Sequence, residues 1–167
     1  MLAHGLADLS LRPLAAAIGS SPRVLLYLFG SKEGLVRALL ARARADELAL
    51  LSRLDGNGAN LRAVAEQVWS WLVAEEHRAL LTLWVEGYGR SLVDPDGPWA
   101  GFAGATVEDW LSVLAAAQPP AHRDTAAGLA EPTLVLAVLR GALLDLLATG
   151  DAGRTTAAVR RLLDSVL

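Results

Sequence analysis

Apolar residues recur three or four positions apart along most of this 167-residue chain, and no stretch alternates apolar and polar residues long enough to form a strand. Alanine and leucine dominate, aromatic residues make up only 5%, and the β-branched residues are scattered. The sequence therefore predicts an all-α fold. Serine, glycine and proline divide it into helices expected at residues 11–18, 22–28, 31–54, 61–77, 79–93, 99–118, 121–149 and 152–167. Within 121–149, Pro132 should either kink the helix or make Thr133 the first residue of its main part.

Composition and motif content exclude several classes of protein. Hydrophobic residues make up 53% of the chain, which is enough for a sizeable core and argues against disorder. There is no cysteine and there are only three, widely spaced histidines, so we expect neither a disulfide scaffold nor a metal site. The chain lacks a phosphate-binding loop, a dinucleotide-binding glycine pattern and an HExxH motif. We therefore expect no cofactor and no enzymatic activity.

The location expected for the chain follows from its charges and hydropathy. The most apolar stretch, residues 134–147, contains Arg140 and Asp145, so we expect no membrane span. No basic residue precedes Arg12, which argues against a signal peptide. The sequence thus predicts a soluble, cytoplasmic protein.

Charge is distributed unevenly along the chain. Residues 1–44 hold six basic and two acidic residues, a net charge of +4, whereas residues 45–167 hold nine basic and sixteen acidic residues, a net charge of −7. A basic head on an acidic body favours a polyanionic partner for the head alone. Chance is the competing explanation, because the enrichment is modest.

Two short helices separated by a glycine, followed by a longer helix, are expected near the N-terminus. Ser10 is placed to cap the first helix, which Gly19 ends, and Ser21 and Pro22 open the second, which Gly30 ends. This spacing is typical of a helix-turn-helix, in which the first helix braces a second one short enough to enter the major groove of DNA.

The same pattern predicts which side chains of these two helices point inward. Leu11, Leu14, Ala15 and Ile18 share one face of the first helix. In the second helix we expect Leu25, Leu26 and Phe29 inside, and Ser21, Arg23 and Val24 facing solvent or DNA. Tyr27 either contacts a phosphate or fills the core with its ring.

Residues 10–36, SLRPLAAAIGSSPRVLLYLFGSKEGLV, resemble the DNA-binding signature of the TetR family of bacterial transcription regulators. The resemblance combines the turn glycine Gly19, the pair Tyr27 and Phe29 at the end of the second helix, and Ser-Lys-Glu opening the next helix. Residues 139–151, LRGALLDLLATGD, are more loosely similar to the penultimate helix and turn of many such regulators, and the middle of the chain matches only in helix count and order. Two departures stand out: only nine residues precede Ser10 where the family usually has a full helix, and Leu28 occupies a position that is often polar.

The resemblance implies a homodimer in which residues 1–44 form the DNA-binding head, with its first helix truncated or missing, and residues 45–167 bind an effector and dimerise. By position, Ser10, Tyr27 and Lys32 would contact phosphates, and Ser21 and Arg23 would face base edges or the backbone. The DNA contacts expected in all are Ser10, Arg12, Ser21, Arg23, Val24, Tyr27 and Lys32.

The body contains all five tryptophans of the chain, which could form the flat walls of an effector pocket. Ordinary core packing is the alternative for each of them. Trp69 and Trp71 lie two positions apart on a helix, so they cannot face the same way. The expected walls are Trp69, Trp84, Tyr88 and Trp110, and the expected polar anchors are His77, Glu86 and Thr106.

The last two helices are the expected dimer interface. Residues 134–147 are apolar nearly all round and need cover on every side, which a symmetric four-helix contact would supply. The alternative is complete burial within one subunit. Arg140 would pair with Asp145 across or along the contact. The interface residues expected are Leu136, Arg140, Leu143, Leu147, Val159, Leu162, Leu163 and Val166.

Together these features predict a ligand-responsive, DNA-binding transcription regulator, a repressor released from its operator by a small apolar or aromatic effector. The helix at 31–54 would couple head to body. The alternative is a dimeric helical module that binds a ligand or a protein without binding DNA.

Overall fold

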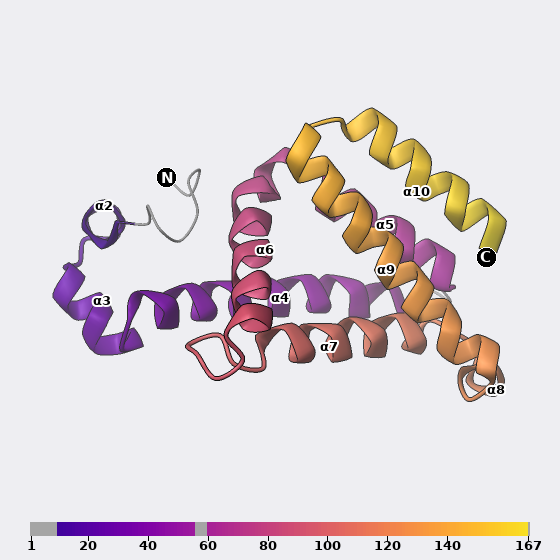
Figure 1. Cartoon of the computed structure of the whole chain (residues 1–167), viewed down its shortest axis with the longest axis horizontal. Helices are drawn as coiled ribbons and strands as arrows, with labels where there is room; N and C mark the ends of the chain where they lie inside the picture. Colours follow the sequence, from indigo (N-terminus) through magenta and orange to yellow (C-terminus); the bar gives the residue numbers. More distant parts are fainter. Residues whose placement is uncertain (1–9, 56–59, 167) are drawn as a thin grey trace. The chain divides into compact units, whose positions relative to one another are not determined.

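All regular structure in the described part of the chain is helical, as the sequence predicts (Figure 1). The computed structural model describes residues 10–55 and 60–166, and it describes the side chains of these residues except 43, 44, 46–55 and 166. The elements are α2 (Leu11–Ala17), α3 (Pro22–Phe29), α4 (Lys32–Asp55), α5 (Leu61–Val73), the 3-10 helix η1 (Glu75–His77), α6 (Arg78–Val93), α7 (Phe102–Ala116), α8 (Pro120–Arg123), α9 (Ala126–Thr149) and α10 (Ala152–Val166).

Three of the predicted helices depart from the structure by more than two residues. The helix predicted at 61–77 ends at Val73 and continues only as η1. The helix predicted to begin at residue 99 begins at Phe102, after Gly101 has taken a positive φ of 73°. The segment 121–149 is interrupted before Thr125, whose hydroxyl accepts a hydrogen bond from the Gly128 N–H at 3.0 Å and so starts α9 anew.

Pro132 lies inside α9, and the helix is continuous on both sides of it. The alternative in which the main helix opens at Thr133 is therefore wrong. Pro132 is the seventh residue of α9 and is buried, so it contributes apolar surface to the core from within the second turn.

The chain divides into two compact units, and the division differs from the predicted boundary at residue 44. The first unit joins the chain up to residue 46 with residues 79–103, and the second joins 47–78 with 104–167. The reason lies in a core cluster of the first unit, where Val36 and Leu40 of α4 pack against Leu83 of α6 and against Trp99. Helix α6 therefore belongs with the N-terminal helices.

The second unit is built on α9, which packs against α5 and α10. Trp69 of α5 is buried, and its indole N–H donates to the Thr156 hydroxyl of α10 at 3.0 Å. Trp71, two positions on, is only half-buried and stacks on His77 with ring centroids 4.1 Å apart. The expectation that these two tryptophans face different ways is confirmed.

Four of the eight residues predicted at a dimer interface are buried inside this unit, because α5 and α10 already cover that stripe of α9. They are Leu136, Leu143, Val159 and Leu163. Arg140, Leu147 and Leu162 are half-buried, and the side chain of Val166 lies outside the described residues. The large apolar side chains that α9 does expose are different ones, namely Leu129, Leu134 and Leu144.

Helix α9 is also long and apolar enough to cross a membrane, judged by length and composition only. The core helix of a water-soluble protein meets the same criterion, and one third of the most apolar window of α9 is buried against its own chain.

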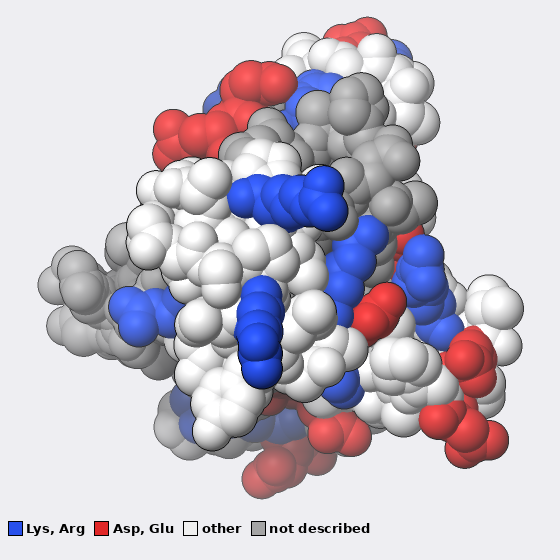
Figure 2. All heavy atoms as spheres, turned by 90° about the vertical axis from the view of Figure 1, so that its left-hand side faces the viewer, with Lys and Arg blue, Asp and Glu red and all other residues white. Residues whose placement is uncertain are grey.

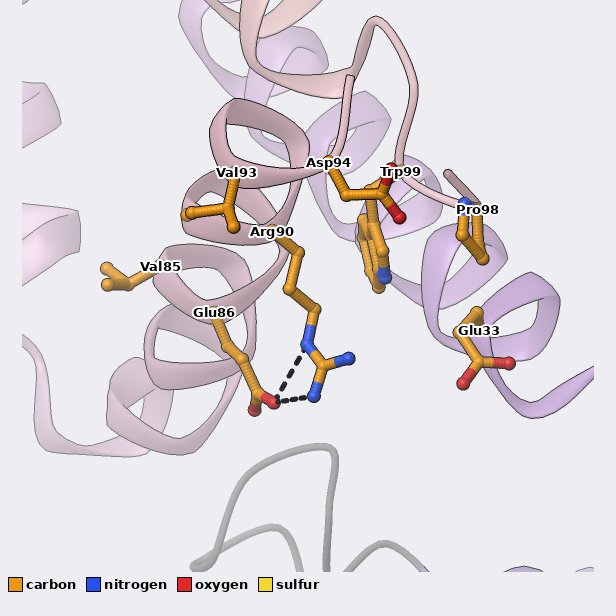
Figure 3. Close-up of a pocket in the computed structure, with 9 residues that line it drawn as sticks. Glu33, Val85, Glu86, Arg90, Val93, Asp94, Pro98 and Trp99 are labelled. Carbon is orange, nitrogen blue, oxygen red and sulfur yellow. Dashed lines mark hydrogen bonds and ion pairs between the residues drawn. The ribbon is translucent and has the colours of Figure 1, made fainter. Parts of the chain in front are cut away.

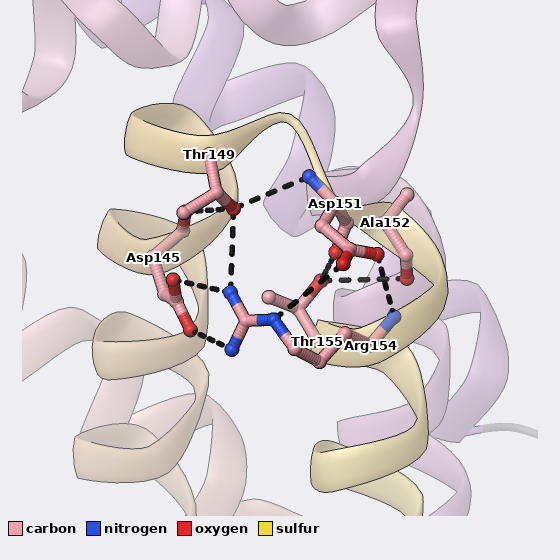
Figure 4. Close-up of polar contacts among 6 residues, drawn as sticks. All are labelled: Asp145, Thr149, Asp151, Ala152, Arg154 and Thr155. Atoms are coloured by element: carbon pink, nitrogen blue, oxygen red, sulfur yellow. Dashed lines mark hydrogen bonds and ion pairs between the residues drawn. The ribbon is translucent and has the colours of Figure 1, made fainter.

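The corner between α9 and α10 is held by a polar network (Figure 4). Gly150 takes the left-handed conformation that ends α9, at φ 71°, and Asp151 Oδ1 accepts the Arg154 N–H at 2.9 Å to start α10. The Arg154 guanidinium donates to both carboxylate oxygens of Asp145 at 2.7 Å. Within the chain, Asp145 is thus engaged by Arg154. The pairing of Arg140 with Asp145 across or along a dimer contact stays a prediction. Hydrogen bonding to Arg154 lowers the pKa of Asp145 below its ordinary value of 3.8, and Asp145 raises the pKa of Arg154 in return.

We predict that Asp145→Asn lowers the melting temperature at pH 7 and that this difference disappears in acid. Because the folded-state pKa of Asp145 is depressed, its contribution is present above the ordinary pKa and is lost as the pH falls through the folded-state pKa. Melting curves of both proteins from pH 7 to pH 2 measure the difference. Asp96→Asn, at an exposed carboxylate, is the control; a difference for Asp145→Asn that does not change with pH contradicts the prediction.

Candidate nucleic-acid interface

The N-terminal segment, defined as α2, α3 and the first turns of α4 (residues 10–40), owes its two tight turns to glycine and serine. Gly19, with φ 66°, follows α2, and the Ser21 hydroxyl accepts the Val24 N–H at 3.3 Å where α3 begins. Gly30, with φ 75°, ends α3. The positive φ values at both glycines are unfavourable for side-chain-bearing residues, so both turns require glycine.

The turn from α3 into α4 also depends on Gly34. The Ser31 hydroxyl accepts the Gly34 N–H at 3.0 Å. A Cβ added at residue 34 would lie 2.1 Å from the carbonyl oxygen of Phe29, so the end of α3 approaches the backbone of α4 more closely than any side chain permits. This contact sets the direction of α3 relative to α4.

A small core holds the three helices together. Ala15 of α2, Leu25 of α3 and Leu35 of α4 are buried against one another, and Leu11 and Leu14 pack on them half-buried. The expected inward face of the first helix is thus confirmed for three of its four residues. The fourth, Ile18, is 62% exposed because α2 ends before it.

Two predicted inward side chains of α3 instead reach the surface. Leu26 and Phe29 are both exposed, because Leu25 alone fills the space that α2 and α4 offer. With Val24 and the 64% exposed Leu28, they make the outer face of α3 largely apolar.

The predicted DNA contacts lie on the outside of the N-terminal segment. Tyr27 is 87% exposed, which excludes the alternative that its ring fills the core, and Lys32, in the first turn of α4, is half-buried. The remaining five predicted contacts are all exposed: Ser10, Arg12, Ser21, Arg23 and Val24. Ser10 stands at the N-cap of α2 as predicted, but its side chain makes no capping hydrogen bond.

The charge of this segment is one-sided. Helices α2 and α3 contain no acidic residue, and each carries one exposed arginine, Arg12 and Arg23. In α4, Lys32 and Arg37 follow, with Glu33 between them. Figure 2 shows basic side chains standing apart from one another among uncharged ones, with acidic side chains toward the edges of the view. This arrangement suits a polyanion that runs past several single positive charges.

The residues predicted to line an effector pocket belong to both units. Trp84, Glu86 and Tyr88 of α6 lie in the first unit. The rings of Trp84 and Tyr88 are 5.1 Å apart, and Trp84 packs on the core cluster around Trp99. The other four lie in the second unit, where Trp69, Thr106 and Trp110 are buried and His77 stacks on Trp71: Trp69, His77, Thr106 and Trp110. Trp69 lines a hollow of about 320 Å³ between α5 and α10.

A larger hollow, of about 580 Å³, lies within the first unit (Figure 3). Of the predicted pocket residues only the anchor Glu86 lines it, together with Arg90, Asp94, Trp99 and Glu33. Sequence reasoning interpreted Asp94-Pro95-Asp96-Gly97 only as a turn, and nothing in the sequence indicated that this turn would share a hollow with the start of α4. Among the described residues, no group of three or more His, Asp or Glu is placed to hold a metal ion.

We predict that Gly34→Ala destabilises the protein by about 2 kcal/mol or more, because the new methyl group would overlap the Phe29 carbonyl. Urea unfolding followed by circular dichroism measures the effect. Gly89→Ala in α6 is the matched control. A Cβ added at residue 89 would meet no atom within 4 Å outside its own stretch of helix, so the substitution should stabilise the helix by about 0.5–1 kcal/mol. Equal effects of the two substitutions would contradict the close approach at Gly34.

Comparison with known proteins assigns no family to the chain. No family model matches it, and neither a curated protein nor a solved structure matches it. The likeness of residues 10–36 to the TetR signature is therefore a resemblance of sequence alone, and any function has to be inferred from the arrangement of these side chains.

Proposed function

We propose that the protein is a ligand-responsive transcription regulator that binds double-stranded DNA as a homodimer and acts as a cytoplasmic repressor. The observation that carries the proposal is the position of α3. This short helix is held on α2 and α4 by Leu25, and it presents Arg23, Val24 and Tyr27 to solvent.

The dimensions of α3 suit the major groove. Its eight residues span about 12 Å, and the major groove of B-DNA is about 12 Å wide. Ser21 and Arg23 at its N-terminal end would reach base edges, with the guanidinium donating two hydrogen bonds to a guanine. Tyr27, Lys32 and Ser10 would donate to phosphates and thereby hold the helix in register, and Arg12 would add attraction to the backbone.

Regulation requires a path from an effector to the DNA-binding helices. Helix α4 is the candidate, because it begins at the turn that orients α3 and continues beyond residue 46 into the second unit. An effector that favours one position of α4 would change the separation of the two α3 helices in a dimer. It would thereby shift the population away from the form that spans two half-sites.

A specific observation supports a second candidate function, a helical interaction module that binds a protein instead of DNA. The outer face of α3 exposes Leu26, Leu28 and Phe29 next to its single arginine. An exposed apolar patch of this kind is typical of protein contact surfaces. The two functions differ in their dependence on salt, because apolar association is not weakened by added salt.

We predict that Arg23→Ala weakens binding to DNA by about 1–3 kcal/mol, which is roughly five- to 150-fold. Fluorescence anisotropy with duplexes selected from a random-sequence library measures the affinity. Arg160→Ala, at an exposed arginine of α10, is the charge-matched control and should change the affinity less than about twofold. The wild-type affinity should fall with salt at a slope of about −0.9 per neutralised phosphate on logarithmic axes.

Two results would contradict DNA binding through α3, and a third would contradict the dimer. One is equal loss of affinity in Arg23→Ala and Arg160→Ala, and another is the absence of any selected duplex. The third is a chain that sediments as a monomer under all conditions in which it binds DNA, which would contradict the dimer.

A further inference from the structure

The hollow of the first unit has both a polar and an apolar side. It is formed by the C-terminal half of α6, the turn that follows it and the first turn of α4. Val85, Val93 and Pro98 supply apolar surface. At about 580 Å³ the hollow falls within the size range of small-molecule sites.

Trp99 forms part of its wall and is held there rigidly. Its ring lies on α6 so closely that a Cβ at Gly87 would come within 2.5 Å of it, and Phe102 packs edge-on against it at 5.2 Å. The Ser91 hydroxyl accepts the Ala103 N–H at 3.1 Å, which ties the chain just after Trp99 to α6. The Trp99 side chain is only 2% exposed.

The indole nitrogen of Trp99 has no hydrogen-bond partner among the described residues. Figure 3 shows this nitrogen on the edge of the ring that lies toward Glu33 and Pro98. A buried donor without an acceptor costs about 1–3 kcal/mol, and an acceptor atom of a bound molecule would recover this energy.

The charges around the hollow are unbalanced. Arg90 is the one cation among the lining residues and is engaged by Glu86, whose Oε1 accepts from its Nε at 3.2 Å and from its Nη2 at 2.8 Å. The carboxylates of Glu33 and Asp94 have no hydrogen-bond or ion-pair partner in the part of the chain that the structure describes. With both ionised, the lining residues carry a net charge of −2.

We propose that this hollow is the binding site of a small organic cation that also carries a hydrogen-bond acceptor. The cationic group would lie between Glu33 and Asp94, the acceptor would take the Trp99 N–H, and the apolar body would contact Val85, Val93 and Pro98. An organic anion fits poorly, because two of the three lining carboxylates have no ion-pair partner among the described side chains. A bare metal ion would leave both the indole N–H and the apolar wall without a partner.

This site shares only Glu86 with the pocket expected of the tryptophan-rich body, and its binding chemistry does not depend on the proposed regulatory function. The titration below contains no DNA. If tyramine does not bind, the proposal that the protein binds DNA is therefore unaffected. If no operator is found, the result of the titration is unaffected.

The experiment titrates the intact protein with tyramine, a primary amine with a phenolic oxygen, and follows the tryptophan indole N–H signals by 15N–1H NMR. Loss of one signal in Trp99→Phe identifies the Trp99 resonance among the five. We expect tyramine to shift this resonance downfield, because the N–H gains an acceptor. We expect 4-ethylphenol, which lacks the ammonium group, to bind about tenfold more weakly or not at all.

Carboxylate variants test the position of the cation. Glu33→Gln and Asp94→Asn should each weaken tyramine binding about tenfold. Asp96→Asn, in the same turn but outside the hollow, should change it less than about twofold and controls for net charge. Unchanged positions of the other four indole signals report an intact fold in each variant.

Any of three results overturns the proposal. The first is a Trp99 signal that tyramine does not move, and the second is equal affinity for tyramine and 4-ethylphenol in the wild-type protein. The third is an equal loss of affinity in Asp94→Asn and Asp96→Asn, which would show attraction to the acidic surface in general. The comparison of the two ligands needs no variant, so it decides the question even if a substitution impairs folding.

Discussion

The backbone contact between the end of α3 and the start of α4 is the constraint on which the N-terminal segment depends. The Phe29 carbonyl lies where a side chain at residue 34 would be, so only glycine allows the turn. With α3 held in this direction relative to α4, Leu25 enters the small core, and Arg23 and Tyr27 remain outside. The proposed interface with DNA thus depends on the close contact at Gly34, three residues after the turn between α3 and α4.

A second close approach has a similar effect in the same unit. Gly87 allows the Trp99 ring to lie directly on α6, and Val36 and Leu40 of α4 pack on the same cluster. The result is a compact unit made of two separate stretches of chain. The wall of its hollow includes an indole N–H that has no hydrogen-bond partner among the residues that the structure describes. A ligand in this hollow would contact Glu33, four residues after the end of α3.

The long apolar helix α9 needs to be covered, as its sequence predicts, but helices of its own chain provide much of the cover. Its sequence demands cover on nearly every side. Within the chain α5 and α10 provide much of it, so Leu136 and Leu143 are interior residues. What remains exposed on α9 is a sparser set of large apolar side chains, Leu129, Leu134 and Leu144.

Local sequence was sufficient for the all-helical class, for most helix ends and for the outward position of Arg23, because capping, glycine turns and helical spacing act within a few residues of one another. It was insufficient for the exposure of Leu26 and Phe29, for the return of α6 onto α4 and for the hollow beside Trp99. An apolar spacing shows that a helix has a face to bury, but it does not specify the partner of that face. Burial, pairing of charges and the lining of a cavity depend on residues far apart in the chain, and so they emerged only with the packed helices.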